Sequence, residues 1–194
     1  MAIARVSLNL TCRSATRALR ITEAGSINGT MPSPQHGRRR LPPIGKEGRV
    51  ALLIWGDPSL YDSSLRIARR IDSLTEIEVI PGITAIQALC AAHKLPLNEI
   101  GEPFLVTTGR RLRESDWPSG VDTIVVMLDG GTAFQSLDPT GIQIWWGAYL
   151  GMPDQIIKSG PLAEVGPQIV EIRRDARERH GWIMDSYILK RASR

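Results

Sequence analysis

The sequence is poor in the residues that bind metals and form disulfides. It has 194 residues, of which two are cysteine, Cys12 and Cys90, and three are histidine. The cysteines are far apart and lack metal-site spacing, so they indicate a reducing, cytoplasmic compartment without a disulfide framework. His36, His93 and His180 form no ligand pattern, so we expect surface or helix-end histidines and no metal site.

Long apolar runs and the signatures of several enzyme classes are also missing. No run approaches the roughly 18 apolar residues that span a bilayer, so no membrane segment is expected. There is no Gly-x-Gly-x-x-Gly fingerprint, which leaves a nicotinamide enzyme without support. Ser, His and Asp occur without nucleophile-elbow spacing, so hydrolase chemistry is unsupported too. A hydrophobic content of 42% is typical of a soluble globular protein.

Positive charge is concentrated in the N-terminal quarter. Residues 1–50 hold nine Lys/Arg and two Asp/Glu, a net charge of +7, whereas the rest of the chain carries −3. Within this quarter, residues 4–12 alternate as in a half-buried strand suited to a sheet edge, and residues 26–49 are too rich in Gly, Pro, Ser and Arg to build a core. We therefore interpret residues 1–48 as a basic, largely irregular segment. Its Arg38-Arg39-Arg40 run could touch nucleic acid, but a solvated charge run is favoured and no nucleic-acid partner is expected.

The composition changes after this segment. Residues 50–54 are an apolar run of strand length, which predicts a strand buried on both faces of a parallel sheet. The run leads into Trp55-Gly56-Asp57-Pro58 and a predicted helix over 58–73. In this turn the glycine lets a ligand approach the backbone, the aspartate suits an N-cap and the proline fits the first helical position. Open α/β sheets bind ligands at such turns. The alternative is a well-capped turn without a ligand.

A second strand and turn follow the same arrangement. Residues 76–80 are a predicted strand, followed by Pro81-Gly82-Ile83-Thr84 and a helix that Thr84 can cap and that runs to about His93. We expect both turns at the same edge of the sheet, where their backbone N–H groups could form opposite sides of one pocket for an anionic group.

A boundary is predicted at residue 103, because Gly and Pro interrupt the chain there. This gives a partial α/β domain over 49–103 and a second α/β domain over 104–194. Strands are expected in the second domain at 104–107, 123–128, 142–146 and, antiparallel, 182–189. A basic turn is expected at 108–113, and helices at 132–137, 153–158 and 167–180.

Three segments together resemble the tetrapyrrole (corrin/porphyrin) methylases. They are Ile-Trp-Gly-Asp-Pro-Ser-Leu-Tyr at 54–61, Val-Ile-Pro-Gly-Ile-Thr-Ala-Ile at 79–86 and Gly-Trp-Ile-Met-Asp-Ser-Tyr-Ile-Leu at 181–189. The Gly-Glu-Pro…Thr-Thr-Gly-Arg-Arg-Leu block at 101–112 resembles more particularly the members that methylate precorrin-5. The resemblance covers about residues 48–191.

The resemblance implies a tetrapyrrole methylase-like α/β fold with a partial N-terminal parallel-sheet domain and a mixed-sheet C-terminal domain. It also implies an S-adenosylmethionine-dependent methyltransferase of cobalamin biosynthesis, with the cofactor between the domains. The expected reaction methylates precorrin-5 at C1 and releases acetate to give precorrin-6A, and the expected assembly is a homodimer. In-line methyl transfer depends mainly on positioning, which agrees with a sequence that has no catalytic triad, dyad or metal site.

By position in the family pattern, the expected cofactor contacts are Gly56, Asp57, Leu60, Ala85, Ile86, Leu128 and Met127. The family usually has a Met-Gly pair where this chain has Met127-Leu128-Asp129, which leaves the register of that contact open. Arg110 and Arg111 are plausible anchors for substrate carboxylates, together with Arg113. A solvated basic turn is the alternative for these arginines, and no catalytic residue is assigned.

The chain also departs from the family pattern. Family members begin with a Gly-x-Gly-x-Gly-Asp loop and roughly a hundred further residues before the Gly-Asp-Pro turn, the size of such a half-domain. Nothing in residues 1–49 has that loop, so an N-terminally truncated or altered chain of low activity is expected. The alternative is a catalytically impaired remnant that retains only the fold or cofactor binding.

Overall fold

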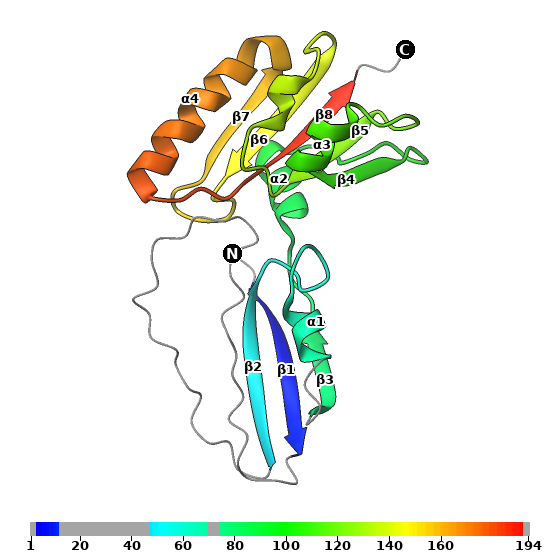
Figure 1. Ribbon diagram of the computed structural model, residues 1–194, viewed down its shortest axis with the longest axis vertical. Helices are drawn as coiled ribbons and strands as arrows, with labels where there is room; N and C mark the ends of the chain where they lie inside the picture. The colour runs from blue at the N-terminus through cyan, green and yellow to red at the C-terminus, as the bar shows by residue number, and fades with distance from the viewer. Residues whose placement is uncertain (1–2, 12–46, 70–73, 192–194) are drawn as a thin grey trace. The chain divides into compact units, whose positions relative to one another are not determined.

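The computed structural model describes residues 3–11, 47–69 and 74–191. By its contacts the chain divides into two compact units, Met1–Thr84 (unit 1) and Ala85–Arg194 (unit 2). Figure 1 shows the elements of both units.

Unit 1 contains a three-stranded sheet in the order β2-β1-β3. The central strand β1 (Ile3–Thr11) pairs antiparallel with both β2 (Glu47–Trp55) and β3 (Leu74–Ile80). Two predictions were therefore wrong, namely that the first strand suits a sheet edge and that this sheet is parallel. An alternating pattern shows which face of a strand is buried. It does not show whether the backbone pairs with a neighbouring strand on one side or on both sides.

Neighbouring residues at the end of β2 differ in burial. Leu53 is 72% exposed, whereas the next residue, Ile54, is 3% exposed. The prediction of burial on both faces over residues 50–54 was wrong at Leu53. The short helix α1 (Ser64–Ala68) is the only helix described in this unit. An uninterrupted apolar run does not by itself require burial on both faces.

The predicted helix over 58–73 is shorter in the structure. Residues 58–63 form turns before α1 begins at Ser64, and residues 70–73 lie outside the described ranges. Tyr61 has a φ of 51°, in the left-handed region, and this interrupts the helical backbone. Periodicity alone gave no sign of this break.

Unit 2 contains a five-stranded mixed sheet in the order β4-β5-β8-β6-β7. The strands β4 and β5 are parallel, and every other neighbouring pair is antiparallel. This confirms the predicted mixed sheet and the predicted antiparallel closing strand. The strands are β4 (Phe104–Thr108), β5 (Thr123–Met127), β6 (Ile142–Ala148), β7 (Ile156–Pro161) and β8 (Asp185–Arg191).

The helices of unit 2 complete its core. They are α2 (Ala85–His93), α3 (Gly109–Ser115), the 3-10 helix η1 (Ala133–Ser136) and α4 (Leu162–His180). Helix α4 packs against β6 and β7, and Figure 1 shows it lying along these strands. Large side chains from the middle of the sheet are fully buried, among them Ile124, Trp146 and Tyr187.

Three predicted elements of unit 2 differ in the structure. The predicted helix at 153–158 was wrong, because this segment leads into β7, whose adjacent isoleucines, Ile156 and Ile157, suit a strand. Helix α4 begins at Leu162, so Pro167 lies inside the helix and not at its first turn. The predicted basic turn at 108–113 is largely helix α3.

The two units divide earlier in the chain than the predicted boundary at residue 103. Helix α2 belongs to unit 2, where it contacts β6 and β8. Leu89 is fully buried, and a ring nitrogen of His93 lies 3.0 Å from the Trp146 carbonyl oxygen. These contacts place α2 in the same unit as the mixed sheet. The Pro and Gly residues on which the predicted boundary was based lie after this helix, within unit 2.

Candidate functional site

The Asp57 carboxylate joins the two glycine-containing turns of unit 1. One oxygen, Oδ1, accepts hydrogen bonds from the Ser59 backbone N–H (2.9 Å) and hydroxyl, and Oδ2 accepts from the Gly82 N–H (2.8 Å). The Ser59 hydroxyl, then the N–H groups of Gly82 and Ser59, hold the pKa of Asp57 below its ordinary value. The aspartate thus accepts the bonds expected of a cap, although no helix begins at this turn.

Gly56 lies directly against the second turn. Its φ is 84°, and a Cβ added here would lie 3.7 Å from the Ile83 carbonyl oxygen and 3.8 Å from the Thr84 Cα atom. Since β2 and β3 both run antiparallel to β1, their C-terminal ends lie at the same edge of the sheet. The predicted convergence of the two turns at one sheet edge is therefore confirmed.

The other residues predicted to contact a cofactor are divided between the units. Leu60 is half-buried, and its N–H donates to the Asp57 carbonyl oxygen (3.3 Å) within the first turn. In unit 2, Ala85 and Ile86 begin α2, and the Ile86 side chain is 6% exposed. Their contact with a ligand stays a prediction.

In unit 2, the turns that follow β4 and β5 pack against each other at the C-terminal edge of this parallel pair. The first turn enters α3, whose N-cap Thr108 accepts a bond from the Arg111 N–H (3.4 Å). The second turn follows Met127 and begins at Leu128, which has a φ of 53°. A Cβ added to Gly109 would lie 2.1 Å from Oδ1 of Asp129. The two turns are therefore in direct contact.

Asp129 is the most extensively bonded side chain of this edge, and no local pattern predicts its role. Its Oδ1 accepts from Arg113 Nη1 (2.9 Å) and the Gly131 N–H (3.0 Å). Its Oδ2 accepts from the Tyr187 hydroxyl (2.6 Å) and the Ala133 N–H (2.5 Å). Burial raises the pKa of Asp129, but these bonds outweigh it and hold the pKa below its ordinary value.

Behind this turn lies a buried ion pair. Arg173 donates from Nε to Asp185 Oδ2 (2.9 Å) and from Nη2 to the Asp129 carbonyl oxygen (2.7 Å). The indole N–H of Trp146 also donates to Asp185 Oδ2 (2.8 Å). The partners of Asp129 come from α3, α4 and β8, which are far apart in the sequence. The sequence therefore indicates a turn at Asp-Gly-Gly and does not indicate these bonds.

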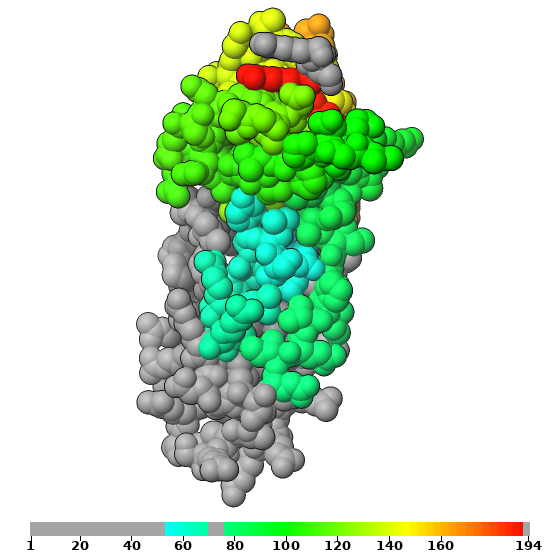
Figure 2. All heavy atoms as spheres, turned by 90° about the vertical axis from the view of Figure 1, so that its right-hand side faces the viewer, coloured from blue at the N-terminus to red at the C-terminus, as the bar shows by residue number. Residues whose placement is uncertain are grey.

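The three arginines of α3 have different environments. Arg113 is paired with Asp129, whereas Arg110 and Arg111 are exposed. Within the described ranges, neither of these two guanidinium groups forms an ion pair. Figure 2 shows that green residues of this part of the chain form much of one face of unit 2. A role for Arg110 and Arg111 in binding carboxylates remains a prediction.

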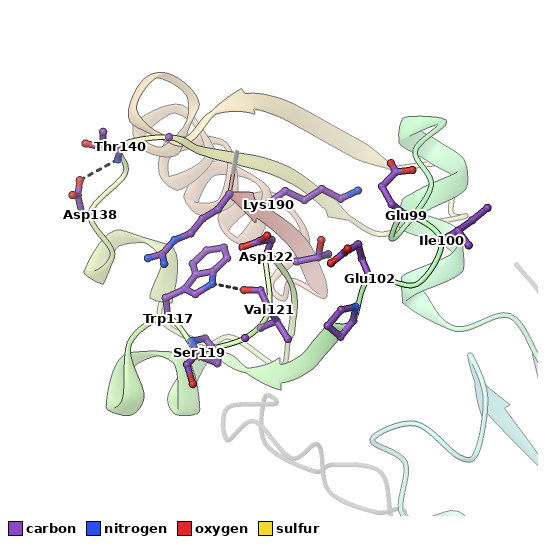
Figure 3. A pocket seen from close by; sticks show the side chains of 16 residues that line it. Glu99, Ile100, Glu102, Trp117, Ser119, Val121, Asp122, Asp138, Thr140 and Lys190 are labelled. Atoms are coloured by element: carbon purple, nitrogen blue, oxygen red, sulfur yellow. Dashed lines mark hydrogen bonds between the residues drawn. The ribbon is translucent and has the colours of Figure 1, made fainter. Parts of the chain in front are cut away.

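A large hollow lies at the other end of the mixed sheet, where β4 and β5 begin (Figure 3). Its volume is about 1260 Å³, and the Arg191 guanidinium lies 4.2 Å from the centre of the Trp117 ring at its wall. The Trp117 indole N–H donates to the Val121 carbonyl oxygen (2.8 Å). No residue of the predicted site lines this hollow. Because open α/β sheets bind ligands at the C-terminal ends of their strands, it is not the predicted site.

In the described part of the chain, no helix is long and apolar enough to cross a membrane. No group of three or more His, Cys, Asp and Glu side chains in the same ranges could hold a metal ion.

Comparisons with known proteins agree on one family. Residues 39–166 match the model of the Tetrapyrrole (Corrin/Porphyrin) Methylases. A curated relative, Precorrin-6A synthase [deacetylating] of Sinorhizobium sp, is 51% identical over 154 residues, which are 77% of this chain and 59% of the relative. The chain therefore spans about 59% of that relative's length.

Solved structures support the same assignment. The crystal structure of a putative cobalamin synthesis related protein (CobF) from Corynebacterium diphtheriae is 45% identical, with a TM-score of 0.67, over 72% of this chain and 60% of that one. Uroporphyrin-III-C-methyltransferase from Thermus thermophilus, at 19% identity and a TM-score of 0.51 over 70% and 60% of the two chains, shows the fold alone. Since the family model covers more than half of the sequence, the chain belongs to the tetrapyrrole (corrin/porphyrin) methylase family.

Proposed function

We propose that this chain is an S-adenosylmethionine-dependent C-methyltransferase of cobalamin biosynthesis, which methylates precorrin-5 at C1 and releases acetate to give precorrin-6A. The identity of 51% with a Precorrin-6A synthase [deacetylating] carries this proposal. Because the chain spans 59% of that relative's length, the activity, the substrate and the partners of this chain are proposals.

The geometry of the first turn fits a cofactor that approaches the backbone. Gly56 presents no side chain at the carboxyl edge of β2, and the bond from Gly82 to Asp57 fixes the position of the turn. Both Asp57 oxygens accept bonds from the protein, so this residue also shapes the turn. The proposed cofactor contacts are Gly56, Asp57, Leu60, Ala85, Ile86, Leu128 and Met127.

The proposed chemistry depends more on alignment than on acid–base groups. The bound cofactor supplies an electrophilic methyl group, and the protein holds the attacking carbon of the tetrapyrrole in line with it. Release of acetate requires a water molecule whose oxygen bonds to the acetyl carbonyl carbon while the carbon–carbon bond to the macrocycle breaks. The macrocycle keeps the electron pair of that bond, and a proton of the water is released with the acetate. We propose Arg110 and Arg111 as anchors for substrate carboxylates, because both are exposed near the C-terminal edge of β4.

We further propose that the chain forms a homodimer. Strand β4 is at the edge of the mixed sheet, and Phe104 and Leu105 are 39% and 36% exposed. Exposed apolar edge strands favour pairing with another chain. Light scattering during gel filtration should give twice the chain mass for the wild type and a lower mass for Leu105→Lys. A monomeric wild type would contradict the proposal.

The central test is calorimetric titration with S-adenosylhomocysteine. We expect Gly56→Val to weaken binding by about tenfold or more, equivalent to about 1.4 kcal/mol. Gly101→Val is the matched control, because Gly101 has the same φ of 84° and no atom within 4 Å of an added Cβ. Both variants introduce the same backbone strain, and only the first changes the proposed pocket. Equal affinities of wild type and Gly56→Val would refute the pocket.

Turnover distinguishes an active enzyme from an impaired remnant. Incubation of the chain with precorrin-5 and S-adenosylmethionine should release one acetate for each S-adenosylhomocysteine formed. Cofactor binding without either product would favour the remnant. Absence of both binding and turnover would reject the proposed function.

A further inference from the structure

The bonds of Asp129 join three separate parts of unit 2. The N–H groups of Gly131 and Ala133 close the turn that contains Asp129 itself. Arg113 Nη1 connects the same carboxylate to α3, and the Tyr187 hydroxyl connects it to β8 in the centre of the sheet. Asp129 is 4% exposed, so these bonds are protected from competition with water.

The close packing around Asp129 leaves its turn little freedom. Gly109, the first residue of α3, has no space for a side chain because Asp129 Oδ1 lies only 2.1 Å from an added Cβ. On the other side of the turn, Arg113 Nη1 lies 3.0 Å from a Cβ added to Gly131. The start of α3 and the turn after β5 therefore cannot move independently.

Leu128 requires such support. It has a φ of 53°, a conformation that costs a non-glycine residue free energy and persists only where its surroundings enforce it. Its neighbour Asp129 is held on both sides, by the four bonds to its carboxylate and by the bond from Arg173 Nη2 to its carbonyl oxygen. The residue that follows Leu128 thus fixes the conformation of Leu128.

We propose that Asp129 is a positioning residue, which locks Leu128 and the start of α3 into one rigid surface at the carboxyl edge of the β4–β5 pair. This inference rests on the proposed function, in which Leu128 contacts the cofactor and Arg110 and Arg111 contact the substrate. Asp129 itself is buried, and its carboxylate bonds are to protein groups. Its removal should therefore weaken ligand binding beyond what the accompanying loss of stability explains.

A matched pair of tyrosine variants separates positioning from stability. Tyr187→Phe removes the hydroxyl that donates to Asp129 and that also has a bond from the Phe134 backbone. Tyr149→Phe removes the hydroxyl of another buried tyrosine, whose acceptors are the carbonyl oxygens of Trp182 (2.5 Å) and Ala176 (3.4 Å). Tyr187 and Tyr149 are 1% and 2% exposed, so the two changes are comparable in burial. Both should lower the unfolding temperature, and only Tyr187→Phe removes a partner of the turn.

The first readout is the dissociation constant of S-adenosylhomocysteine. Loss of one hydrogen bond to a charged group should raise it about threefold or more in Tyr187→Phe, and Asp129→Asn should raise it about tenfold. Tyr149→Phe should stay within about twofold of the wild type at equal temperature below unfolding. Equal effects of the two tyrosine variants would overturn the positioning role.

The second readout is amide hydrogen exchange, which needs no ligand. Tyr187→Phe and Asp129→Asn should speed exchange at 109–115 and 128–133 together, whereas Tyr149→Phe should leave both segments protected. If wild type does not bind S-adenosylhomocysteine, the proposed function fails and exchange alone decides the positioning role. Faster exchange spread evenly over unit 2, or confined to one of the two segments, would overturn it. If Asp129→Asn does not fold, the tyrosine pair carries the test.

Discussion

Replacement of Arg173 by methionine should destabilise unit 2 strongly. The arginine side chain is 11% exposed and its partner Asp185 is 5% exposed, with Nε and Oδ2 separated by 2.9 Å. Methionine keeps much of the aliphatic volume and leaves the Asp185 carboxylate buried without its cation. Removing one partner of a buried pair costs about 3–5 kcal/mol, because the remaining charge has lost its compensation. For a unit of this size, we expect the unfolding temperature to fall by roughly 10–25 °C.

The dependence of this loss on pH tests its electrostatic origin. Burial raises the pKa of Asp185 above its ordinary value, and Arg173 opposes that shift. In the variant the opposition is gone, so the folded state binds a proton at Asp185 more tightly than the unfolded state does. The stability linked to this proton is present below the unfolded pKa and is lost as pH rises through the folded one. The Arg173→Met variant should therefore regain part of its stability relative to the wild type when pH falls from 8 to 5.

A double variant completes the experiment. Arg173→Met combined with Asp185→Asn removes both charges and retains an oxygen that can accept from the Trp146 indole N–H. Unfolding in urea, followed by circular dichroism, should show that the double variant regains at least half of the stability lost in Arg173→Met. A single variant that loses less than about 1 kcal/mol, or a double variant no more stable than the single one, would refute the reasoning.

Three further outcomes are expected. Gly147→Ala should cost about 1–3 kcal/mol of unfolding free energy in urea, because an added Cβ would lie 2.6 Å from Leu150 Cδ2 and 2.9 Å from Cδ1 of the fully buried Leu89 and would overpack the core. Leu53→Lys should change that free energy by less than about 0.5 kcal/mol, since Leu53 is 72% exposed; a larger loss would show that this face is covered. The Gly82 amide resonance should follow the titration of Asp57 with a midpoint below the ordinary aspartate value, because the bonds from the Ser59 hydroxyl and from the Gly82 N–H lower the pKa of this carboxyl; the linked stability is present above the unfolded pKa and lost as pH falls through the folded one.

Much of unit 2 could be predicted from local patterns. The strand that became β5 was visible as an apolar run, and its central residues are fully buried. The segment that became β7 was not, because a short stretch with two isoleucines beside a proline and an aspartate has no decisive period. Its strand conformation depends on pairing with β6, a partner that lies outside any local window.

Only the parts of the candidate site that contain a local sequence motif could be predicted. The Gly56 and Gly82 turns could be found because each contains a glycine and a proline close together, directly after an apolar run of strand length. Asp129 could not be assigned a role, since its importance comes from Arg113, Tyr187 and other residues that only the tertiary structure brings together. The predicted sheet of unit 1 failed for a related reason, because pairing partners are chosen by the whole sheet and not by one strand.

The central position of β1 has a consequence for how unit 1 folds. Its register joins Ile3 to Trp55 and Arg5 to Ile80, so every strand pair of this sheet links distant parts of the chain and none is a tight hairpin. Non-local pairing slows folding, because the entropy of closing a long loop is lost before any contact forms. In unit 2, β6 and β7 are joined by a short connection and can pair early. We therefore expect unit 2 to fold first. Because each doubling of a loop adds only about 0.6 kcal/mol to its closure, doubling the connection between β1 and β2 would destabilise unit 1 by about that amount and slow its folding by at most about threefold.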